Sequence, residues 1–200
     1  MLTLRKIAVT GGLASGKSAV CRFLRQLGAF VVSSDEIVHQ LLSSSTDLIQ
    51  QVTRLLGSHI VKNGAIDRRE VAQTVFKKPE LLSQLEKILH PAVLEEIERR
   101  YKQACQTEGQ HAFVVEIPLL FEIGAETFYD VVIAVIANEQ TAKERFIASG
   151  HFELEYNERM KRQLSNSIKS AKANYTLTNN GTLDDLQKKT EQLYNLITKK

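Results

Sequence analysis

Residues 11–18 read Gly-Gly-Leu-Ala-Ser-Gly-Lys-Ser and directly follow an apolar run, residues 7–9. This order fits the pattern G-x-x-x-x-G-K-[ST], which forms a phosphate-binding loop between a strand and a helix. Glycine at positions 11 and 16 permits backbone angles closed to other residues and lets main-chain N–H groups approach an anion. The segment 18–27 has apolar residues at 20, 23, 24 and 27, the spacing of a helix with one buried face. We therefore expect a strand, a phosphate-binding loop and a helix at the start of the chain.

Each position of this loop has an expected task. Lys17 can reach the β- and γ-phosphates of a nucleotide, and the Ser18 hydroxyl can ligate Mg²⁺. The N-terminus of the following helix directs partial positive charge at the phosphates. A glycine-rich turn without this function is disfavoured, since a strand precedes the motif and a helix follows it. The residues expected to bind the nucleotide here are Gly11, Gly12, Ala14, Ser15, Gly16, Lys17, Ser18 and Ala19.

The composition is that of a soluble globular protein, with 200 residues, 43% hydrophobic and 24% charged, and a net charge of +3. No basic tract is long enough for a nucleic-acid-binding arm, and no run of about eighteen apolar residues offers a membrane span. Cys21 and Cys105 form no CxxC pair and have no histidine at ligand spacing. We expect a cytoplasmic protein with reduced thiols that binds neither nucleic acid nor membranes. The sequence indicates no particular protein partner.

Short apolar runs alternate with helical patterns along most of the chain. The expected strands are residues 4–10, 30–32, 112–117, 131–136 and 175–178. Strands separated by helices indicate a parallel sheet with helices on both faces. The predicted fold class is α/β, with three layers around a mainly parallel, five-stranded sheet.

Two stretches interrupt this alternation. Residues 36–108 show helical patterns and no convincing strand, which predicts a helical insertion above the sheet. Two of these patterns, at 81–89 and 92–101, are separated by Pro91. The second stretch, residues 145–173, is rich in charge. It is either a mobile cover over the phosphates or an ordinary pair of polar surface helices.

Three polar residues beyond the loop are candidates for chemistry. Asp35 follows the second expected strand, where α/β sheets place ligands. It is placed to accept a proton from an attacking hydroxyl or to help order Mg²⁺. Its alternative role is to cap the helix that starts at Glu36, and the two roles are not exclusive. Glu116 ends the third expected strand and is placed to lie near the metal without ligating it. His90 precedes Pro91 and, taken alone, is typical of a helix end.

Several motifs of other nucleotide-binding proteins are missing from the sequence. Asn-Lys-x-Asp does not occur, and no Asp lies three residues before a Gly. The sequences His-Arg-Asp and Asp-Phe-Gly of protein kinases are missing too. A GTPase switch and a protein kinase are therefore disfavoured.

Further motifs follow the loop in a fixed order: Gly28-Ala29, Ser34-Asp35, residues 64–69 (Gly-Ala-Ile-Asp-Arg-Arg), Val75-Phe76, residues 85–91 (Leu-Glu-Lys-Ile-Leu-His-Pro), residues 116–122 (Glu-Ile-Pro-Leu-Leu-Phe-Glu), Arg159, Gln163 and residues 179–181 (Asn-Asn-Gly). The loop alone is shared by many NTPases. In combination with the His-Pro and Pro-Leu-Leu-Phe-Glu segments, it resembles the dephospho-CoA kinase family over nearly the whole chain.

The resemblance implies transfer of the γ-phosphoryl group of ATP to the ribose 3′-hydroxyl of dephospho-CoA, giving CoA and ADP, the last step of coenzyme A biosynthesis. It implies ATP as co-substrate with Mg²⁺, and dephospho-CoA as acceptor. It also implies a P-loop core at 1–35, 109–145 and 174–200, an acceptor-binding insertion at 36–108, and a lid at 146–173.

The resemblance also implies residue roles. Asp35 is the expected base for the 3′-hydroxyl, and Asn180 and Gly181 lie near the adenine of ATP. The residues expected around the acceptor are Asp35, His90, Pro118, Leu119, Leu120 and Glu122.

This chain departs from the family pattern at three positions. Members usually carry a second arginine a few residues after the one matching Arg145, whereas residues 146–150 here read Phe-Ile-Ala-Ser-Gly. We expect Arg159 or Arg162 to take its place, with Arg159 as the catalytic candidate. Glu116 stands for the usual Asp, and Ala19 for the more frequent Thr.

The alternative functions are those of another small-molecule P-loop kinase, such as one for nucleoside monophosphates, or of a nucleotide-dependent switch or binding protein.

Overall fold

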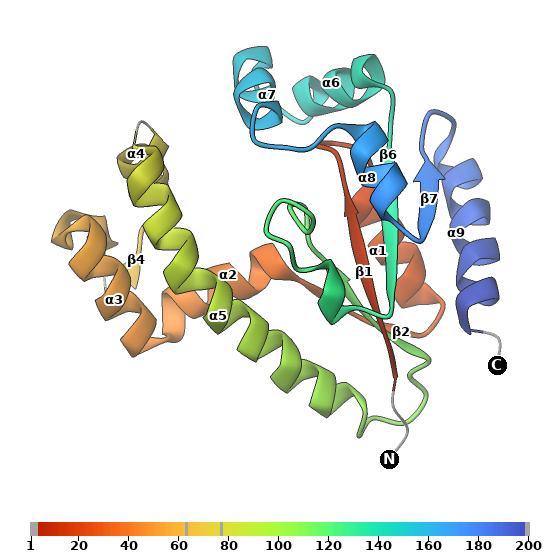
Figure 1. The fold of residues 1–200 in the computed structure, drawn as a ribbon, viewed down its shortest axis with the longest axis horizontal. Helices are drawn as coiled ribbons and strands as arrows, with labels where there is room; N and C mark the ends of the chain where they lie inside the picture. Colours follow the sequence, from red (N-terminus) through yellow and green to blue (C-terminus); the bar gives the residue numbers. More distant parts are fainter. Residues whose placement is uncertain (1–3, 63, 77, 199–200) are drawn as a thin grey trace. The chain divides into compact units, whose positions relative to one another are not determined.

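The structure is a computed structural model that describes residues 4–62, 64–76 and 78–198, so the outermost residues of the expected core, 1–3 and 199–200, lie outside the described residues. The chain divides into two compact units, residues 33–102 and the residues on either side of them. The elements, labelled in Figure 1 where there is room, are β1 (Arg5–Gly11), α1 (Lys17–Gln26), β2 (Ala29–Ser33), α2 (Ser34–Ser44), α3 (Thr46–Leu56), η1 (Ser58–Ile60), β3 (Val61–Lys62), β4 (Ala65–Ile66), α4 (Arg68–Phe76), α5 (Pro79–Ala104), β5 (Ala112–Glu116), η2 (Glu126–Phe128), β6 (Val131–Ile136), α6 (Glu139–Ala148), α7 (Glu153–Met160), α8 (Asn166–Lys172), β7 (Tyr175–Thr178) and α9 (Leu183–Thr198).

The first unit is built on a five-stranded sheet with the order β2-β5-β1-β6-β7. Strand β1 pairs in parallel with β5 and β6, and β6 pairs in parallel with β7. All five expected strands are confirmed, each within one residue at either end. Because parallel strands finish at the same edge of a sheet, the segments that follow β1, β5, β6 and β7 gather there.

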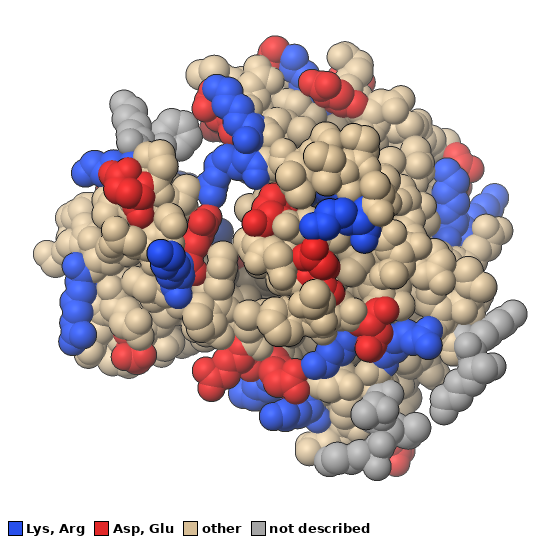
Figure 2. All heavy atoms as spheres, viewed as in Figure 1, with Lys and Arg blue, Asp and Glu red and all other residues tan. Residues whose placement is uncertain are grey.

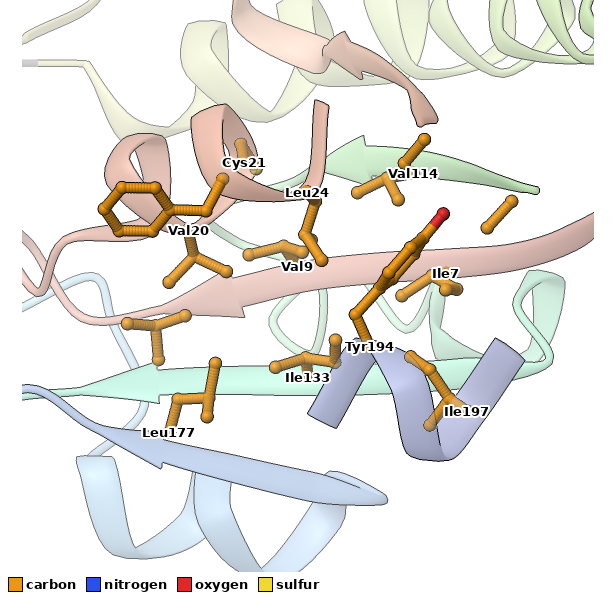
Figure 3. Packing of buried hydrophobic residues seen from close by; sticks show 14 of the residues in the cluster. Ile7, Val9, Val20, Cys21, Leu24, Val114, Ile133, Leu177, Tyr194 and Ile197 are labelled. Atoms are coloured by element: carbon orange, nitrogen blue, oxygen red, sulfur yellow. The ribbon is translucent and has the colours of Figure 1, made fainter. Parts of the chain in front are cut away.

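The core of this unit lies between the sheet and the helices α1 and α9, which pack against each other. Successive strand residues point to opposite faces, and Ile7 and Val9 of β1 point to this side. Figure 3 shows them with Val20 and Leu24 of α1 and with Tyr194 of α9. Burial raises the pKa of the Tyr194 phenol to about 12, so this group stays neutral in the core. Each large apolar side chain buried here contributes about 1.5–3 kcal/mol to folding.

The second unit, residues 33–102, has an apolar core of its own. Helices α2, α3, α4 and α5 contribute buried residues to it: Leu42, Leu48, Val52, Leu56, Val71, Val75 and Leu85. The expectation of purely helical structure at 36–108 is wrong, because β3 and β4 form a small antiparallel hairpin. Strands of two residues are too short to show an alternation of apolar and polar positions in the sequence.

Residues 64–69 contain the second strand of this hairpin and the start of the next helix. Gly64 has a φ of 80°, a conformation that favours glycine. The Asp67 carboxylate accepts hydrogen bonds from the backbone N–H groups of Arg69 and Glu70, and it pairs with Lys62 at 2.8 Å. The motif Gly-Ala-Ile-Asp-Arg-Arg therefore has a local structural task.

The expected break at His90-Pro91 is also wrong. Helix α5 runs from Pro79 to Ala104 with Pro91 inside it. An internal proline removes one backbone hydrogen bond and costs about 3 kcal/mol. Apolar residues on both sides of it are buried, among them Leu85 and Val93, and their burial offsets that cost. His90 is consequently a half-buried residue in the middle of a helix.

Charged side chains of both signs are interspersed on the face of the molecule drawn in Figure 2. This distribution agrees with 26 basic and 23 acidic residues in the sequence. None of the helices in the described part of the chain combines the length with the apolar character that a membrane span requires.

Candidate active site

The loop at residues 11–18 joins β1 to α1, as the motif predicts. Gly11 has a φ of 147° and Gly16 a φ of 101°. A Cβ at Gly11 would lie 1.9 Å from the Val135 carbonyl oxygen of β6, and one at Gly16 would lie 2.3 Å from Asn179 Nδ2. Both positions therefore require glycine for the backbone angle and for the space.

Asn179, directly after β7, stabilises the loop through hydrogen bonds, although it is not part of the loop. Its Nδ2 donates to the Ser15 carbonyl oxygen at 2.8 Å, and its own N–H donates to the Ile136 carbonyl oxygen at 2.8 Å. Arg145 Nη1 in turn donates to the Asn179 carbonyl oxygen at 3.0 Å. Asn179 is buried. The motif at 179–181 does not indicate this supporting role, because Asn179 and Ser15 lie 164 residues apart in the sequence.

The Lys17 ammonium lies among the carbonyl groups of the loop. Its Nζ donates to the Gly12 carbonyl oxygen at 2.7 Å and to the Gly11 carbonyl oxygen at 3.2 Å. The residue is only 9% exposed and starts helix α1, whose N-terminus adds partial positive charge. Positive charge and closely spaced backbone N–H groups together suit a phosphate chain.

Ser18 and Glu116 bring two oxygen groups together at the edge of the sheet. The Ser18 hydroxyl donates to Glu116 Oε1 at 3.0 Å. A hydroxyl and a carboxylate beside a phosphate-binding loop form a donor set that fits Mg²⁺, which prefers oxygen ligands.

Burial and, to a smaller extent, the negative charge of Glu116 raise the pKa of the nearby Cys21 thiol well above its usual range. Cys21 is therefore a protonated core residue and not a nucleophile.

Asp35 lies in the first turn of α2 and is exposed. The helix is capped by Ser33, whose hydroxyl accepts the Glu36 N–H at 3.5 Å. The alternative that Asp35 caps a helix starting at Glu36 is thus wrong, because the helix begins at Ser34. Asp35 and His90 belong to the unit 33–102. Their positions are therefore described relative to the other residues of that unit.

The segment 118–122 after β5 is held by buried polar contacts. The Pro118 carbonyl oxygen accepts from Thr10 Oγ1 at 3.2 Å and from Lys169 Nζ at 3.1 Å. Glu122 Oε1 pairs with Lys169 Nζ at 2.9 Å and accepts the Leu164 N–H at 2.8 Å. Leu120 is fully buried, and Leu119 is half-buried.

Lys169 is one of several charged residues in the stretch 145–173, yet its side chain is fully buried. Helix α8 has only seven residues, too few to show which face is buried. No local signal in the sequence therefore identifies the contact of Lys169 with Glu122.

Arg159, on α7, is exposed, and its guanidinium lies over the ring of Phe146 at 5.4 Å from the centroid. The Phe146 ring also stacks on His151 at 4.5 Å and contacts Tyr156. The apolar cluster around Phe146 packs against Leu13 and Ala14 of the loop. The aromatic residue after Arg145 thus connects α7 to the loop.

Asn180 and Gly181 are exposed at the same edge of the sheet. The Asn180 side chain accepts from the Asn138 N–H at 2.7 Å and donates to Asn138 Oδ1 at 2.9 Å. A Cβ at Gly181 would lie 2.8 Å from Asp185 Oδ2, which in turn accepts from Thr182. The structure therefore gathers the loop, Glu116, the segment 118–122 and residues 179–181 in one unit.

Comparison with known proteins agrees with this arrangement. The family model described as dephospho-CoA kinase matches residues 5–185. The chain is 47% identical to the dephospho-CoA kinase of Protochlamydia amoebophila over 97% of each sequence. It is 42% identical to that of Chlamydia pneumoniae, over 97% of this chain and 96% of the relative. The crystal structure of TT1252 from Thermus thermophilus is similar with a TM-score of 0.83 and 30% identity, covering 99% of this chain and all of that one. The chain therefore belongs to the dephospho-CoA kinase family.

Proposed function

We propose that the chain transfers the γ-phosphoryl group of ATP to the ribose 3′-hydroxyl of dephospho-CoA, giving CoA and ADP. The observation that carries the proposal is the family match over residues 5–185, together with an intact phosphate-binding loop. Phosphoryl transfer depends mainly on positioning and on neutralising charge, and the loop supplies both.

The nucleotide site consists of the loop and its surroundings. The backbone N–H groups of residues 11–18 and the Lys17 ammonium would bind the phosphates as negative charge moves to the leaving oxygen. Asn180 and Gly181 would lie beside the adenine. Their support is their place after β7, at the edge of the sheet that carries the loop.

Ser18 is the proposed ligand of Mg²⁺, and Glu116 holds the Ser18 hydroxyl in place. When bound, the metal ion neutralises phosphate charge and fixes the geometry of the phosphate chain. The usual Asp of the family is a Glu at this position. The longer side chain still reaches the hydroxyl at hydrogen-bond distance.

Asp35 is the proposed base. It is exposed and caps no helix, so its carboxylate has no structural task of that kind. It would orient the 3′-hydroxyl and accept its proton as the new P–O bond forms. The residues that would surround the acceptor are His90, Pro118, Leu119, Leu120 and Glu122, and further residues of the stretch 36–108 would bind its remainder.

Residues 146–173 would cover ATP and exclude water, which otherwise competes as acceptor.

Arg159 is the proposed replacement for the second arginine that family members carry after the one matching Arg145. Its stacking on Phe146 supports this assignment. The test compares steady-state turnover of Arg159→Ala and Arg162→Ala. We expect a loss of about 100-fold in Arg159→Ala, the usual effect of removing one charge-stabilising donor. Near-normal turnover in both variants would dismiss the assignment.

The activity itself is tested with an acceptor panel at fixed ATP and Mg²⁺. The panel contains dephospho-CoA, nucleoside monophosphates and no acceptor. We expect phosphorylation of dephospho-CoA alone, detected as CoA by mass spectrometry. Phosphorylation of a nucleoside monophosphate in its place would favour another small-molecule kinase, and slow hydrolysis without a phosphorylated product would favour a switch protein.

A further inference from the structure

Lys169 is a fully buried lysine to which the proposed function gives no task. Its ammonium lies 2.9 Å from Glu122 Oε1 and 3.1 Å from the Pro118 carbonyl oxygen. Both partners belong to the segment 118–122, the proposed wall of the acceptor site. Thus one cation on α8 contacts the first and the last residue of that segment.

The Pro118 carbonyl oxygen also links this segment to the phosphate-binding loop. It accepts a second hydrogen bond from Thr10 Oγ1, and Thr10 directly precedes Gly11. Helix α8 is itself fixed near the loop, because Asn166 Nδ2 donates to the Ala137 carbonyl oxygen at 2.9 Å and a Cβ at Gly12 would lie 2.9 Å from Asn166 Oδ1. Lys169 therefore completes a set of contacts that fixes the segment 118–122 relative to the loop.

A contact with a purely structural role would not require a buried charge. Taking an ammonium and a carboxylate out of water costs several kcal/mol for each ion, which good geometry only partly offsets. On the same helix, Lys172 pairs with Glu126 at 2.7 Å while remaining 42% exposed. An exposed pair of that kind joins α8 to the chain without the penalty. The Lys172 ammonium lies 5.0 Å from the centroid of the Phe121 ring, so it too contacts the segment 118–122. The buried pair differs in burial and in its polar partners, since Lys169 contacts the Pro118 carbonyl oxygen and the Glu122 carboxylate.

Charge gives Lys169 a second effect on the same segment. The acceptor and ATP are both anionic, and the Glu122 carboxylate lies on the segment that would contact the acceptor. The adjacent ammonium balances that carboxylate, so the segment presents no net negative charge to an anionic ligand.

We propose that Lys169 is a positioning residue for the acceptor: it fixes the Pro118 carbonyl and the Glu122 carboxylate, and thereby the segment 118–122 that binds dephospho-CoA. The inference rests on the proposed function. It predicts that loss of Lys169 impairs acceptor binding and leaves ATP binding largely intact.

The test measures KM for each substrate and kcat in Lys169→Met and in the control Lys143→Met, whose pair with Glu153 contains no residue of the segment 118–122. We expect Lys169→Met to raise KM for dephospho-CoA about 10-fold or more, since small misplacements in a site are costly. KM for ATP stays within about twofold to threefold. Lys143→Met stays within about twofold for every parameter, as expected for a surface pair. An unchanged acceptor KM in folded Lys169→Met, or equal rises for both substrates, would overturn the inference.

Removing only the lysine leaves the Glu122 charge buried, and Lys169→Met can fail to fold for that reason. The comparison then uses Glu122→Gln with and without Lys169→Met. With glutamine at position 122, replacing Lys169 leaves no carboxylate without its cation. We expect the double variant to have an acceptor KM about 10-fold above that of Glu122→Gln. Equal values would overturn the inference. A wild-type chain that does not phosphorylate dephospho-CoA would overturn the proposed function itself, which separates the two failures.

Discussion

Two buried lysines, Lys17 and Lys169, lie in the same unit of this molecule and differ in how their places are determined. Lys17 is six residues from Gly11 and five from Gly12, whose carbonyl oxygens its ammonium contacts. Lys169 is 51 residues from Pro118 and belongs to a different element. The first position follows from a local motif and the second from tertiary packing. Accordingly, we assign nucleotide binding to the loop and positioning of the acceptor to the segment held by Lys169.

Asp35→Asn gives the largest expected effect and separates chemistry from both kinds of binding. We expect turnover to fall about 10²- to 10⁴-fold, because the variant has no base for the 3′-hydroxyl. ATP affinity, measured by calorimetry, should remain that of the wild type, since Asp35 lies outside the loop. Wild-type turnover would remove Asp35 from the proposed role.

Lys17→Met tests the nucleotide side of the comparison. We expect kcat to fall about 10²- to 10³-fold, since the variant lacks a cation that stabilises charge on the phosphates. Rapid-quench measurement of phosphoryl transfer gives this rate directly. Dephospho-CoA binding without ATP serves as the control and should be unchanged. If Lys17→Met impaired only the binding of dephospho-CoA, the assignment of Lys17 to the nucleotide and of Lys169 to the acceptor would be contradicted.

Glu116→Gln tests the contact between β5 and the loop. The carboxylate orients the Ser18 hydroxyl, so we expect about 10- to 100-fold more Mg²⁺ to be needed for half-maximal rate. A titration of activity with Mg²⁺ at saturating ATP measures the change. If the Mg²⁺ requirement does not move, Glu116 has no part in the metal site.

Phe146→Leu should give the smallest effect. Leucine keeps the apolar contact with the cluster beside the loop but removes the ring under Arg159. An exposed cation–π contact contributes about 0.5–1 kcal/mol, so we expect a loss of about twofold to fivefold in kcat/KM for ATP. The same substitution in an Arg159→Ala background is the control and should then cause no further loss. An additional loss there would mean that Phe146 acts without Arg159.

The elements of the sheet could be predicted because their signals are local. Strands β5 and β6 are short apolar runs buried on both faces, and the glycine-rich motif marks the start of α1. Prediction failed where a tertiary effect overrides a local one. Pro91 stays inside α5, although a proline usually ends a helix. The failure at α2 is local instead: the helix begins two residues earlier than expected, so Ser33 caps it in place of Asp35.

The loop of the candidate site was predictable, whereas its supports were not. The order of glycines, Lys17 and Ser18 identified the loop because each residue type has a task set by backbone geometry or phosphate chemistry. Asn179 and Lys169 contact partners 164 and 51 residues away, and no spacing in the sequence records such pairs. Their residue types are common at protein surfaces, so only the folded chain distinguishes them.

Product analysis of the wild-type chain tests the central claim most directly. Dephospho-CoA, ATP and Mg²⁺ are incubated with the protein, and ADP and CoA are quantified together, with ³¹P spectroscopy locating the new phosphate. The account predicts equal amounts of ADP and CoA, with the phosphate on the ribose 3′-hydroxyl. Release of ADP without CoA, or phosphate on another group, would contradict it.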